Sequence, residues 1–511
     1  MKHIFITLIC LSIFSIPCFA LPSIHYIAGV SEFIKYNEYT FVDLTANGDD
    51  ALNHGDFHAA ETSYQAAYDL AMAKKNYKLI GYALFGIGAT LGAQGKYDAS
   101  IAKLKQSAGY TNYIEDSAAI ARLYFDLGVS YHFLKQYPSA IENYHIALGY
   151  DHKEYWIYLN LGDAYVDTKD FDSAIANFSI AIVADSTSRI SYNDRGAAYF
   201  RKGDYPHAIS DFNKAISLDS VYANAYFNRG YAYYYAGNYD LAINDFNISM
   251  SLDPSNTDVY KIRGDAYMNI GQYDNAVLDY NSALNYDTNN AELYYSRGLA
   301  YNEQGNYALA IADFTYAIRF DSSYTSAYFN RGLAYYNENN YDYALKDLDH
   351  SIALDSTNPI AFNIRGLVYF AQSNYDQAIA DFHDALRLDS TYYLAYQNIG
   401  IVYHKQEMYA QAIESYTRAV NINPRYLKGY YYRARAYKDN KEYANSIADY
   451  NKVLALDSTD ADAMAGMGKD YQLKNDKISA RLWFEKTLQF KDKLTDWTVE
   501  DINENLKTLG K

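Results

Sequence analysis

A period of 34 residues is the feature that most constrains how this chain can fold. In the segment 223–256, Tyr226, Gly230 and Tyr233 are spaced by four and then three residues, as on one face of a helix. The same residue types return 34 positions further on, at Tyr260, Gly264 and Tyr267. A fixed period of this length indicates one structural unit that is repeated along the chain.

Each unit has the pattern of two helices joined by a turn. In the segment 223–256, Gly237 and Asn238 interrupt the first apolar stripe, and Asp253 and Pro254 end the second. Two helices of this length cannot bury their apolar faces alone. We therefore expect successive units to pack on one another in a one-dimensional array.

The period defines thirteen units between residues 41 and 494. Units of 34 residues run from 121 to 494, and two longer units, 41–80 and 81–120, precede them, each with an expected longer second helix. The eighth position of the unit is glycine except at Ala434, and the twentieth is alanine or serine throughout. Because a glycine within a helix costs about 1 kcal/mol relative to alanine, we expect these two small residues to face each other across a close helix contact.

This placement of aromatic, glycine and alanine residues in a 34-residue period resembles the tetratricopeptide repeat (TPR) family. The resemblance implies an all-α fold, a right-handed solenoid (superhelix) of stacked helix-turn-helix hairpins. It also implies that positions 2, 5, 9, 12 and 13 of each first helix face an inner groove, and that proteins or peptides bind there.

Residues 1–20 have the pattern of a signal peptide. An apolar run from Ile4 to Ile16 follows a basic start, and Cys18 and Ala20 stand just before a suitable cleavage position. The run is shorter than the roughly 20 residues that cross a bilayer, which favours cleavage over a membrane anchor. Both cysteines of the chain lie in this segment, so an exported chain would contain neither disulfides nor thiolate metal sites. We expect a periplasmic or secreted protein of bacterial type.

The two ends of the array lack the repeat pattern. Residues 21–40 are expected to form a leader or an N-terminal helical cap, and residues 495–511 a capping helix. Thr498 and Asp501 match a capping box at the start of that helix. Its apolar stripe consists of Val499, Ile502, Leu506 and Leu509.

An arginine at position 7 and an aspartate at position 23 occur together in seven units, and the units without the arginine also lack the aspartate. Neither neighbouring unit offers Arg433 or Asp449 another such partner. We therefore expect a structural ion pair between the two helices of one hairpin. The pairs are Arg195 with Asp211, Arg229 with Asp245, Arg263 with Asp279, Arg297 with Asp313, Arg331 with Asp347, Arg365 with Asp381, and Arg433 with Asp449.

Groove positions carry the candidate ligand contacts. Most of the 60 tyrosines stand at positions 4, 11, 17 and 24, where we expect them to fill the core. Aromatic residues at groove positions instead favour a protein or peptide ligand. These are Phe227, Tyr231, Tyr234, Tyr235, Tyr295, Phe329, Tyr336 and Phe370.

Charged residues at the groove positions are distributed unevenly along the array. Asp163, Asp167 and Asp265 lie toward its N-terminal half. The basic candidates gather toward its C-terminal end and are Lys405, Lys428, Arg435, Lys438 and Lys469. We expect the basic group to steer an acidic segment of the partner and to set its direction.

No catalytic constellation stands out in the sequence. The glycines near Gly86 and Gly466 resemble nucleotide-binding loops, but they lie within expected helices and follow no strand. His54 and His58 have no evident third metal ligand. The net charge of −17 argues against nucleic acid or an anionic membrane as the general partner.

These observations predict a non-enzymatic scaffold that needs no cofactor or metal and binds proteins or peptides in its groove. The alternative is a glycan-binding module of the cell envelope. In that case groove tyrosines would stack on sugar rings, and Asn228, Asn330 and Asn398 would bond to hydroxyls.

Overall fold

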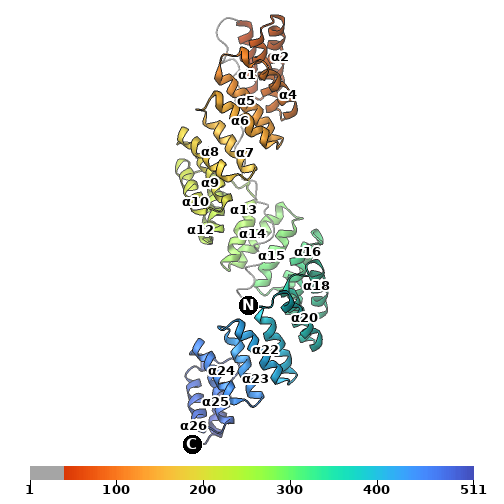
Figure 1. Ribbon diagram of the computed structural model, residues 1–511, viewed down its shortest axis with the longest axis vertical. Helices are drawn as coiled ribbons and strands as arrows, with labels where there is room; N and C mark the ends of the chain where they lie inside the picture. The colour runs from red at the N-terminus through yellow and green to blue at the C-terminus, as the bar shows by residue number, and fades with distance from the viewer. Residues whose placement is uncertain (1–38, 511) are drawn as a thin grey trace. The chain divides into compact units, whose positions relative to one another are not determined.

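The computed structural model describes residues 39–510, and all regular secondary structure in this part of the chain is helical (Figure 1). The predicted all-α fold is confirmed: antiparallel helix pairs stack on one another in chain order. The chain divides into two compact units, one ending at Gln272 and the other beginning at Tyr273, and each is described by itself. The expected signal peptide, residues 1–20, lies outside the described residues.

The first unit contains α1 (Tyr39–Asn53), α2 (Phe57–Ala73), α3 (Tyr77–Ala93), α4 (Tyr97–Ala108), the 3-10 helix η3 (Thr111–Tyr113), α5 (Ser117–Phe133), α6 (Tyr137–Tyr150), α7 (Tyr155–Asp167), α8 (Phe171–Ala184), α9 (Arg189–Lys202), α10 (Tyr205–Leu218), α11 (Ala223–Tyr235), α12 (Tyr239–Leu252) and α13 (Asp258–Asn269). Odd-numbered helices are the first helices of the repeats, and even-numbered helices are the second.

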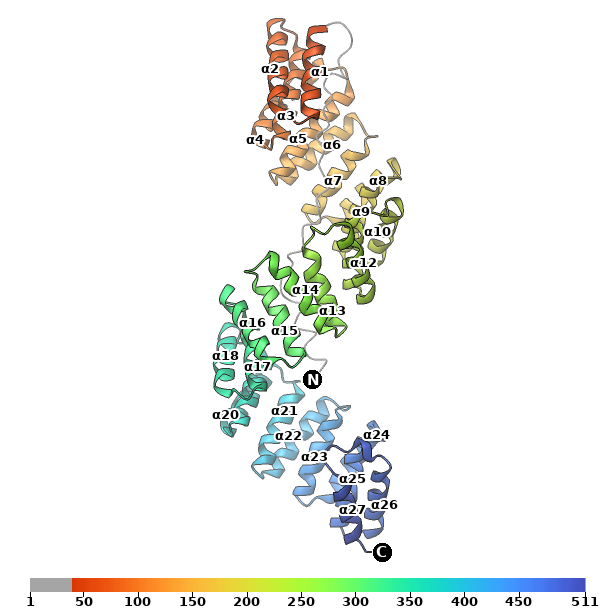
Figure 2. The same ribbon diagram turned by 180° about the vertical axis from the view of Figure 1, so that it is seen from behind.

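The second unit contains α14 (Tyr273–Tyr286), α15 (Ala291–Glu303), α16 (Tyr307–Phe320), α17 (Thr325–Asn337), α18 (Tyr341–Leu354), α19 (Pro359–Ala371), α20 (Tyr375–Leu388), α21 (Tyr393–Lys405), α22 (Tyr409–Ile422), α23 (Leu427–Asp439), α24 (Tyr443–Leu456), α25 (Ala461–Leu473), α26 (Lys477–Leu488), the 3-10 helix η4 (Lys491–Lys493) and α27 (Val499–Thr508). Figure 2 shows α25, α26 and α27 together at the C-terminal end. None of the helices within residues 39–510 is long and apolar enough to span a bilayer.

The turns follow from the residues that form them. Gly203 (φ +86°) caps α9, and Gly237 (φ +79°) follows Ala236, the cap residue of α11. Both have a backbone conformation that glycine adopts without a steric penalty. Between repeats, the carboxylate of Asp355 accepts hydrogen bonds from the backbone N–H (2.9 Å) and hydroxyl (2.6 Å) of Thr357. The aspartate side chain thus stabilises the turn between repeats, beyond the last backbone hydrogen bond of the second helix.

The glycine at position 8 packs against the second helix of its own repeat, next to the large side chain at position 24 and, as expected, close to the small residue at position 20. A Cβ atom added to Gly196 would lie 3.2 Å from the backbone oxygen of Ala208, at position 20. A Cβ atom added to Gly230 would lie 2.7 Å from the ring of the fully buried Phe246, at position 24 of the same repeat. The two helices do approach closely at position 20, because the hydroxyl of Ser100 donates to the carbonyl of Gly88 at 2.8 Å. Glycine is therefore needed to make room for the ring of the second helix.

The glycines that resemble nucleotide-binding loops serve packing between repeats. A Cβ at Gly86 would lie 2.3 Å from the ring of Tyr64, and one at Gly466 would lie 2.4 Å from the ring of Tyr450. Both tyrosines belong to the preceding repeat and are buried. Because Gly86 and Gly466 lie inside α3 and α25, they provide space for a ring and form no loop.

The extra length of the first two repeats is placed differently from the prediction. α2 has 17 residues, as expected for a longer second helix, but α4 has only 12 and is followed by η3. The first helices α3 and α5 instead have 17 residues each. The expected longer second helix is therefore wrong for the repeat 81–120, because length in a repeat pattern does not say which helix holds it.

Helix α27 covers the last hairpin of the second unit. Its capping box joins Thr498 and Asp501 through reciprocal side-chain-to-backbone hydrogen bonds. Ile502 and Leu509 are buried and pack with Phe484 of α26. The segment between α26 and α27 lies on the first helices α23 and α25.

Candidate binding surface on the first helices

Positions 2, 5, 9, 12 and 13 of the odd-numbered helices are called here the first-helix face. Consecutive first helices contact each other within each unit, for example α7 with α9 and α23 with α25. The face is therefore continuous from one repeat to the next inside a unit. It carries the side chains that the sequence pattern assigned to a ligand.

The arginine and aspartate that occur together are bonded within one hairpin. In six pairs, Nε and one Nη of the guanidinium donate to the two carboxylate oxygens at 2.6–2.8 Å, and the aspartate is buried. These are the pairs of Arg195, Arg229, Arg297, Arg331, Arg365 and Arg433 with the aspartates predicted for them. Arg263 belongs to the compact unit that ends at Gln272, and Asp279 to the one that begins at Tyr273. This pair therefore stays a prediction.

Each of these arginines also bonds to the preceding repeat, a contact that the sequence reasoning missed. The remaining Nη of Arg433 donates to the hydroxyl of Thr417 at 3.0 Å, and that of Arg365 bonds to the carboxylate of Asp349 at 2.6 Å. The acceptor always stands at position 25 of the preceding repeat. The sequence contains the signal, since that position bears an oxygen wherever an arginine follows: Ser179, Asn213, Asn247, Asn281, Thr315, Asp349 and Thr417.

Tyrosines at positions 4 and 11 flank these guanidinium groups. The guanidinium carbon of Arg229 lies 5.4 Å from the ring centre of Tyr226 and 5.9 Å from that of Tyr233. Such cation–π contacts shield the ion pair from water. These tyrosines therefore have a structural role, as their positions in the repeat predicted.

Three of the aromatic candidates are core residues, and their assignment to a ligand is wrong. Phe227, Tyr231 and Phe329 are only 7%, 9% and 8% exposed. The ring of Phe227 lies 6.1 Å from that of Phe246 and 4.9 Å from that of Tyr231. Positions 5 and 9 lie where neighbouring hairpins meet, so a large side chain there enters the core between repeats.

The other aromatic candidates differ in what they expose. The hydroxyl of Tyr295 accepts from the amide of Asn330 at 2.9 Å, and burial raises the pKa of this tyrosine to about 12. Tyr235 is 53% exposed, and Tyr234 beside it is partly exposed. Tyr336 and Phe370 are also partly exposed. Tyr295 is likewise partly exposed, but its hydroxyl is bonded to Asn330. The aromatic candidates that remain at least partly exposed and have no such role between first helices are Tyr235, Tyr336 and Phe370, with Tyr234 beside Tyr235.

The asparagines of the glycan-binding alternative are buried and bonded to other side chains. Asn228 donates to the side-chain oxygen of Asn193 at 3.0 Å, and Asn398 to that of Asn363 at 2.8 Å. Asn330 is bonded to Tyr295. Because these amides link consecutive first helices, they offer less to a sugar than the sequence suggested.

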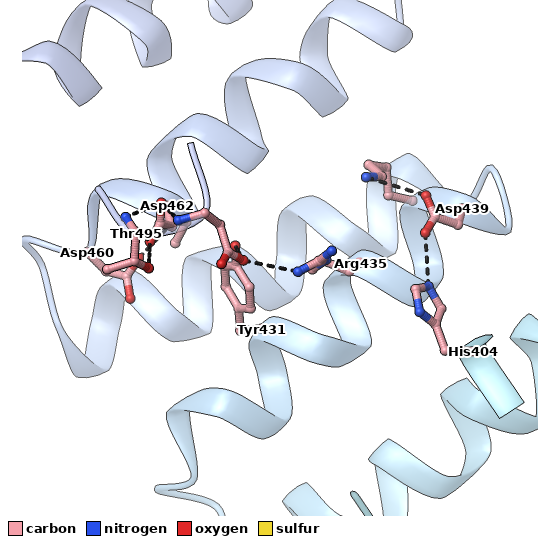
Figure 3. Close-up of polar contacts among 10 residues, drawn as sticks. His404, Tyr431, Arg435, Asp439, Asp460, Asp462 and Thr495 are labelled. Carbon is pink, nitrogen blue, oxygen red and sulfur yellow. Dashed lines mark hydrogen bonds and ion pairs between the residues drawn. The ribbon is translucent and has the colours of Figure 1, made fainter. Parts of the chain in front are cut away.

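The basic candidates near the C-terminus contact the chain itself. Arg435 forms an ion pair with Asp496, which belongs to the segment between α26 and α27. Figure 3 shows Arg435 and Tyr431 near Thr495 of the same segment. The guanidinium donates to the Asp496 carboxylate at 3.0 Å, and the hydroxyl of Tyr431 donates to the same oxygen at 2.8 Å. Lys469 donates to Asn505 of α27 at 2.9 Å. Arg435 and Lys469 are therefore not part of an open basic patch, which corrects the prediction.

The main chain of the same segment is also bound. The carboxylate of Asp462, on α25, accepts hydrogen bonds from the backbone N–H groups of Thr495 and Asp496 at 3.0–3.1 Å and from the Thr495 hydroxyl. Leu494 and Thr498, on either side, have extended backbone conformations. The face of α23 and α25 thus holds a short, bent piece of polypeptide by its main chain and by an acidic side chain.

The remaining basic candidates have different surroundings. The ammonium group of Lys438 lies 3.4 Å from the carboxylate of Asp439. The Asp439 carboxylate also bonds to the imidazole of His404 at 2.9 Å (Figure 3). Lys405 and Lys428 are exposed. A small cavity of about 120 Å³ lies nearby, lined by Ile401, His404, Tyr416, Tyr432 and Arg435.

An acidic region lies on the first-helix face of the first unit. Asp163 on α7 is 9% exposed and Asp194 on α9 is 8% exposed. Burial raises the pKa of Asp194 to about 7, and burial together with the charges of Asp194 and Asp167 raises that of Asp163. Asp163 is one of the groove positions that the repeat pattern predicts, whereas Asp194 is not. Its signal was a carboxylate at position 6, where several other repeats have asparagine.

A second cavity, of about 210 Å³, lies beside this acidic region. It is lined by Asn193, Asn224, Phe227, Asn228, Asp253, Asn256 and Asp258. The amide of Asn193 donates to Asp194 at 3.1 Å and accepts from Asn228, so the carboxylate and the cavity wall are connected. Within residues 39–510 there is no group of three or more His, Cys, Asp or Glu side chains placed to hold a metal ion.

Family models match most of the described chain. TPR repeat models match residues 196–235, 264–305 and 298–339. Tetratricopeptide repeat models match residues 45–113, 125–189, 223–256, 325–358, 356–425 and 398–461. The chain belongs to the tetratricopeptide repeat family. No curated protein sequence matches it.

Solved structures with the same kind of fold include the Cut9–Hcn1 hetero-tetramer of the APC/C, which is 14% identical in sequence. The match covers 92% of this chain and 96% of that chain, with a TM-score of 0.39. Yeast Tom70 has 15% identity, with 76% of this chain and 94% of that chain covered and a TM-score of 0.40. The MamA protein has 30% identity over 34% of this chain and 94% of that chain, with a TM-score of 0.31.

Proposed function

We propose that this protein is a non-catalytic scaffold that binds a protein or peptide partner along its first-helix face. The observation that carries the proposal is the way α23 and α25 hold residues 495 and 496. Asp462 accepts from two consecutive backbone N–H groups, and Tyr431 and Arg435 bind the acidic side chain of Asp496. A surface that binds the main chain and an acidic side chain of its own polypeptide has the chemistry to bind those of another.

Membership of the family supports the same function, since TPR repeats are typical protein-binding modules. Repeat arrays of this kind present a long surface with many shallow contacts rather than one deep pocket. Tyr234, Tyr235, Tyr336 and Phe370 offer partly or largely exposed rings on that surface. Aromatic side chains of this kind supply most of the affinity in protein interfaces.

The proposed partner carries an acidic segment that meets the C-terminal repeats. Lys405 and Lys428 are exposed on α21 and α23, and Lys438 lies on the same face. On a chain with a net charge of −17, local positive charge selects an acidic sequence and sets its direction.

The experiment is a cross-linking pull-down from the native envelope and secreted fractions with the full chain as bait. Beside it runs a variant with Tyr234→Ala, Tyr235→Ala, Tyr336→Ala and Phe370→Ala. We expect a specific protein to be enriched by the wild-type chain and lost from this variant. A matched control replaces exposed tyrosines of second helices, Tyr286→Ala and Tyr343→Ala, and keeps the partner. Failure to enrich any protein, together with a turnover activity of the purified chain, would overturn the proposal.

Export forms a separate part of the proposal. It is supported by the sequence pattern of residues 1–20 and by the presence of both cysteines within them. The mature chain would then begin at Leu21 and contain no thiol. Mass spectrometry of the N-terminal peptide from the native source tests this, and a peptide that retains residues 1–20 on the bulk of the protein contradicts it.

A further inference from the structure

Two buried carboxylates on consecutive first helices lack a full set of partners. Asp163 has no hydrogen bond or ion pair to any residue in the part of the chain that the structure describes. Asp194 accepts one hydrogen bond, from Asn193, and its other carboxylate oxygen is buried without a partner among residues 39–510. A buried carboxylate is costly unless an opposite charge or several donors compensate it.

The surroundings leave this place short of positive charge. The negative charges of Asp194 and Asp167 raise the pKa of Asp163, and the positive charge of Arg201 lowers it. Asp167 has a separate partner, because its carboxylate lies 2.8 Å from the imidazole of His132. Asp194 faces Tyr222 at the start of α11, which adds no positive charge. Among the described residues, Arg201 is thus the positive group that acts on Asp163, whereas Asp194 is stabilised by a hydrogen bond from Asn193.

The negative character continues into the neighbouring cavity. Asn193 lies between Asp194 and Asn228 and lines the cavity of about 210 Å³. Asp253 and Asp258 line the same cavity, and Phe227 provides an apolar wall. Carboxylates, amide oxygens and an aromatic wall suit a long apolar side chain that ends in a positive charge.

We propose that the face formed by α7, α9 and α11 binds a positively charged side chain, lysine or arginine, of the protein partner, with Asp163 and Asp194 as its counter-charges. The inference rests on the proposed function and adds a second anchor to it, of opposite sign to the basic repeats of the second unit. A polypeptide cation fits better than a divalent metal ion, because metal ions such as Ca²⁺ take six to eight oxygen ligands and the described residues offer no cluster of three candidate ligands here.

Binding at this place should release protons. The pKa of Asp194 lies at about 7 and that of Asp163 is raised as well, so part of the free protein carries a proton here at neutral pH. The groups that face this proton are Asp163, Asp167, Arg201, Asn193 and Tyr222. An incoming cation favours the ionised form of both carboxylates and displaces the proton.

The test uses the full chain and two probes, amidated hexalysine and amidated hexaarginine peptides. Binding is measured by isothermal titration near pH 7, in two buffers of different ionisation enthalpy. We expect the wild-type chain to bind a basic peptide with proton release. The variant Asp163→Asn with Asp194→Asn should bind at least about tenfold more weakly and release no proton. The matched control, Asp98→Asn with Asp240→Asn, removes the same charge from exposed positions of α4 and α12 and should bind like the wild type.

Two outcomes would overturn the inference: equal affinity of the basic peptides for the wild type and the Asp163/Asp194 variant, or tighter binding of Ca²⁺ alone or spermine than of either peptide. Circular dichroism of the variant checks that it folds, and the isosteric substitutions make this the expected result. The two proposals fail differently. If the native partner binds the Asp163/Asp194 variant as well as the wild type, only the cation site is wrong, whereas absence of any polypeptide partner removes the proposed function.

Discussion

In the repeats that have it, the position-7 arginine joins the two helices of its hairpin and bonds to the preceding repeat. It forms a paired hydrogen bond to the aspartate of its own hairpin and a third bond to position 25 of the preceding repeat. Tyrosines on both sides of the guanidinium exclude water from it. One side chain thus fixes the helix pair and its contact with the next repeat, because a planar guanidinium can donate in three directions at once.

Removal of one partner should cost more than removal of both. Arg433→Met leaves the buried carboxylate of Asp449 without a counter-charge, and we expect it to destabilise the C-terminal repeats by roughly 3 kcal/mol. The double variant with Asp449→Leu should be less destabilised than Arg433→Met alone. Thermal unfolding and amide exchange of α23 and α24 measure both effects. Equal shifts for the single and double variants would contradict a semi-buried ion pair.

Replacement of the glycine at position 8 by alanine should destabilise the fold. Gly230→Ala places a methyl group within 2.7 Å of the Phe246 ring, and we expect a loss of roughly 1–3 kcal/mol through overpacking. Gly149→Ala, in α6, meets nothing within 4 Å and should be neutral or slightly stabilising. Thermal unfolding of both variants separates the ring contact from helix propensity. A shift of the same sign and size in both would mean that the ring does not require the glycine.

The raised pKa of Asp194 should make the free energy of unfolding depend on pH. Its pKa in the folded chain is raised by burial from 3.8 to about 7, so the folded state holds a proton that the unfolded state releases. This group therefore reduces the free energy of unfolding progressively as pH rises from about 4 to about 7. Asp194→Asn should raise the thermal midpoint more at about pH 8 than at about pH 4.5. An equal difference at both pH values would contradict the raised pKa.

At the scale of elements, the segment between α26 and α27 is a structural part of the last repeats. Asp462 binds its backbone, Tyr431 and Arg435 bind Asp496, and α27 packs on α26. The segment crosses two first helices that precede it by one and two repeats. Its contacts explain why basic residues cluster here without forming an open patch.

Loss of the Asp462 carboxylate should loosen this segment. Asp462→Ala removes the acceptor of two backbone N–H groups, and we expect the amides of Thr495 and Asp496 to exchange at least about tenfold faster, which corresponds to about 1.4 kcal/mol. Hydrogen exchange with mass spectrometry reports the change. Asp492→Ala, at an exposed position of η4, is the matched control and should leave exchange unchanged. Unaltered exchange in Asp462→Ala would show that the segment is held elsewhere.

For the whole molecule, the placement of charge separates two contributions to partner binding. Lys405→Glu with Lys428→Glu should slow association and weaken its salt dependence, because exposed charges steer the encounter. Tyr234→Ala with Tyr235→Ala should mainly speed dissociation. Surface plasmon resonance at two salt concentrations distinguishes them. Lys346→Glu with Lys452→Glu, on second helices, makes the same charge change as a control. Association rates that match the wild type in the Lys405/Lys428 variant would leave these lysines without a role in recognition.

The helical repeat, the hairpin and the pairing of Arg433 with Asp449 could all be predicted from the amino-acid sequence. Each of these depends on residues of one repeat or on a spacing that recurs many times, so one chain contains several independent instances of the same pattern. The capping box at Thr498 was also readable, because its partners lie three residues apart.

Which first-helix side chains are accessible to a partner depends on how the repeats pack and could not be predicted from the repeat pattern. Phe227 and Tyr235 both occupy groove positions, yet the first is buried between hairpins and the second is exposed. The repeat pattern predicts that Arg435 is accessible to a ligand, but in the structure it is bonded to Asp496, 61 residues away in the sequence. The missing compensation at Asp194 likewise depends on helices from neighbouring repeats. Burial and charge compensation depend on groups that are distant in sequence and close in space, and a 34-residue pattern contains no information about those contacts.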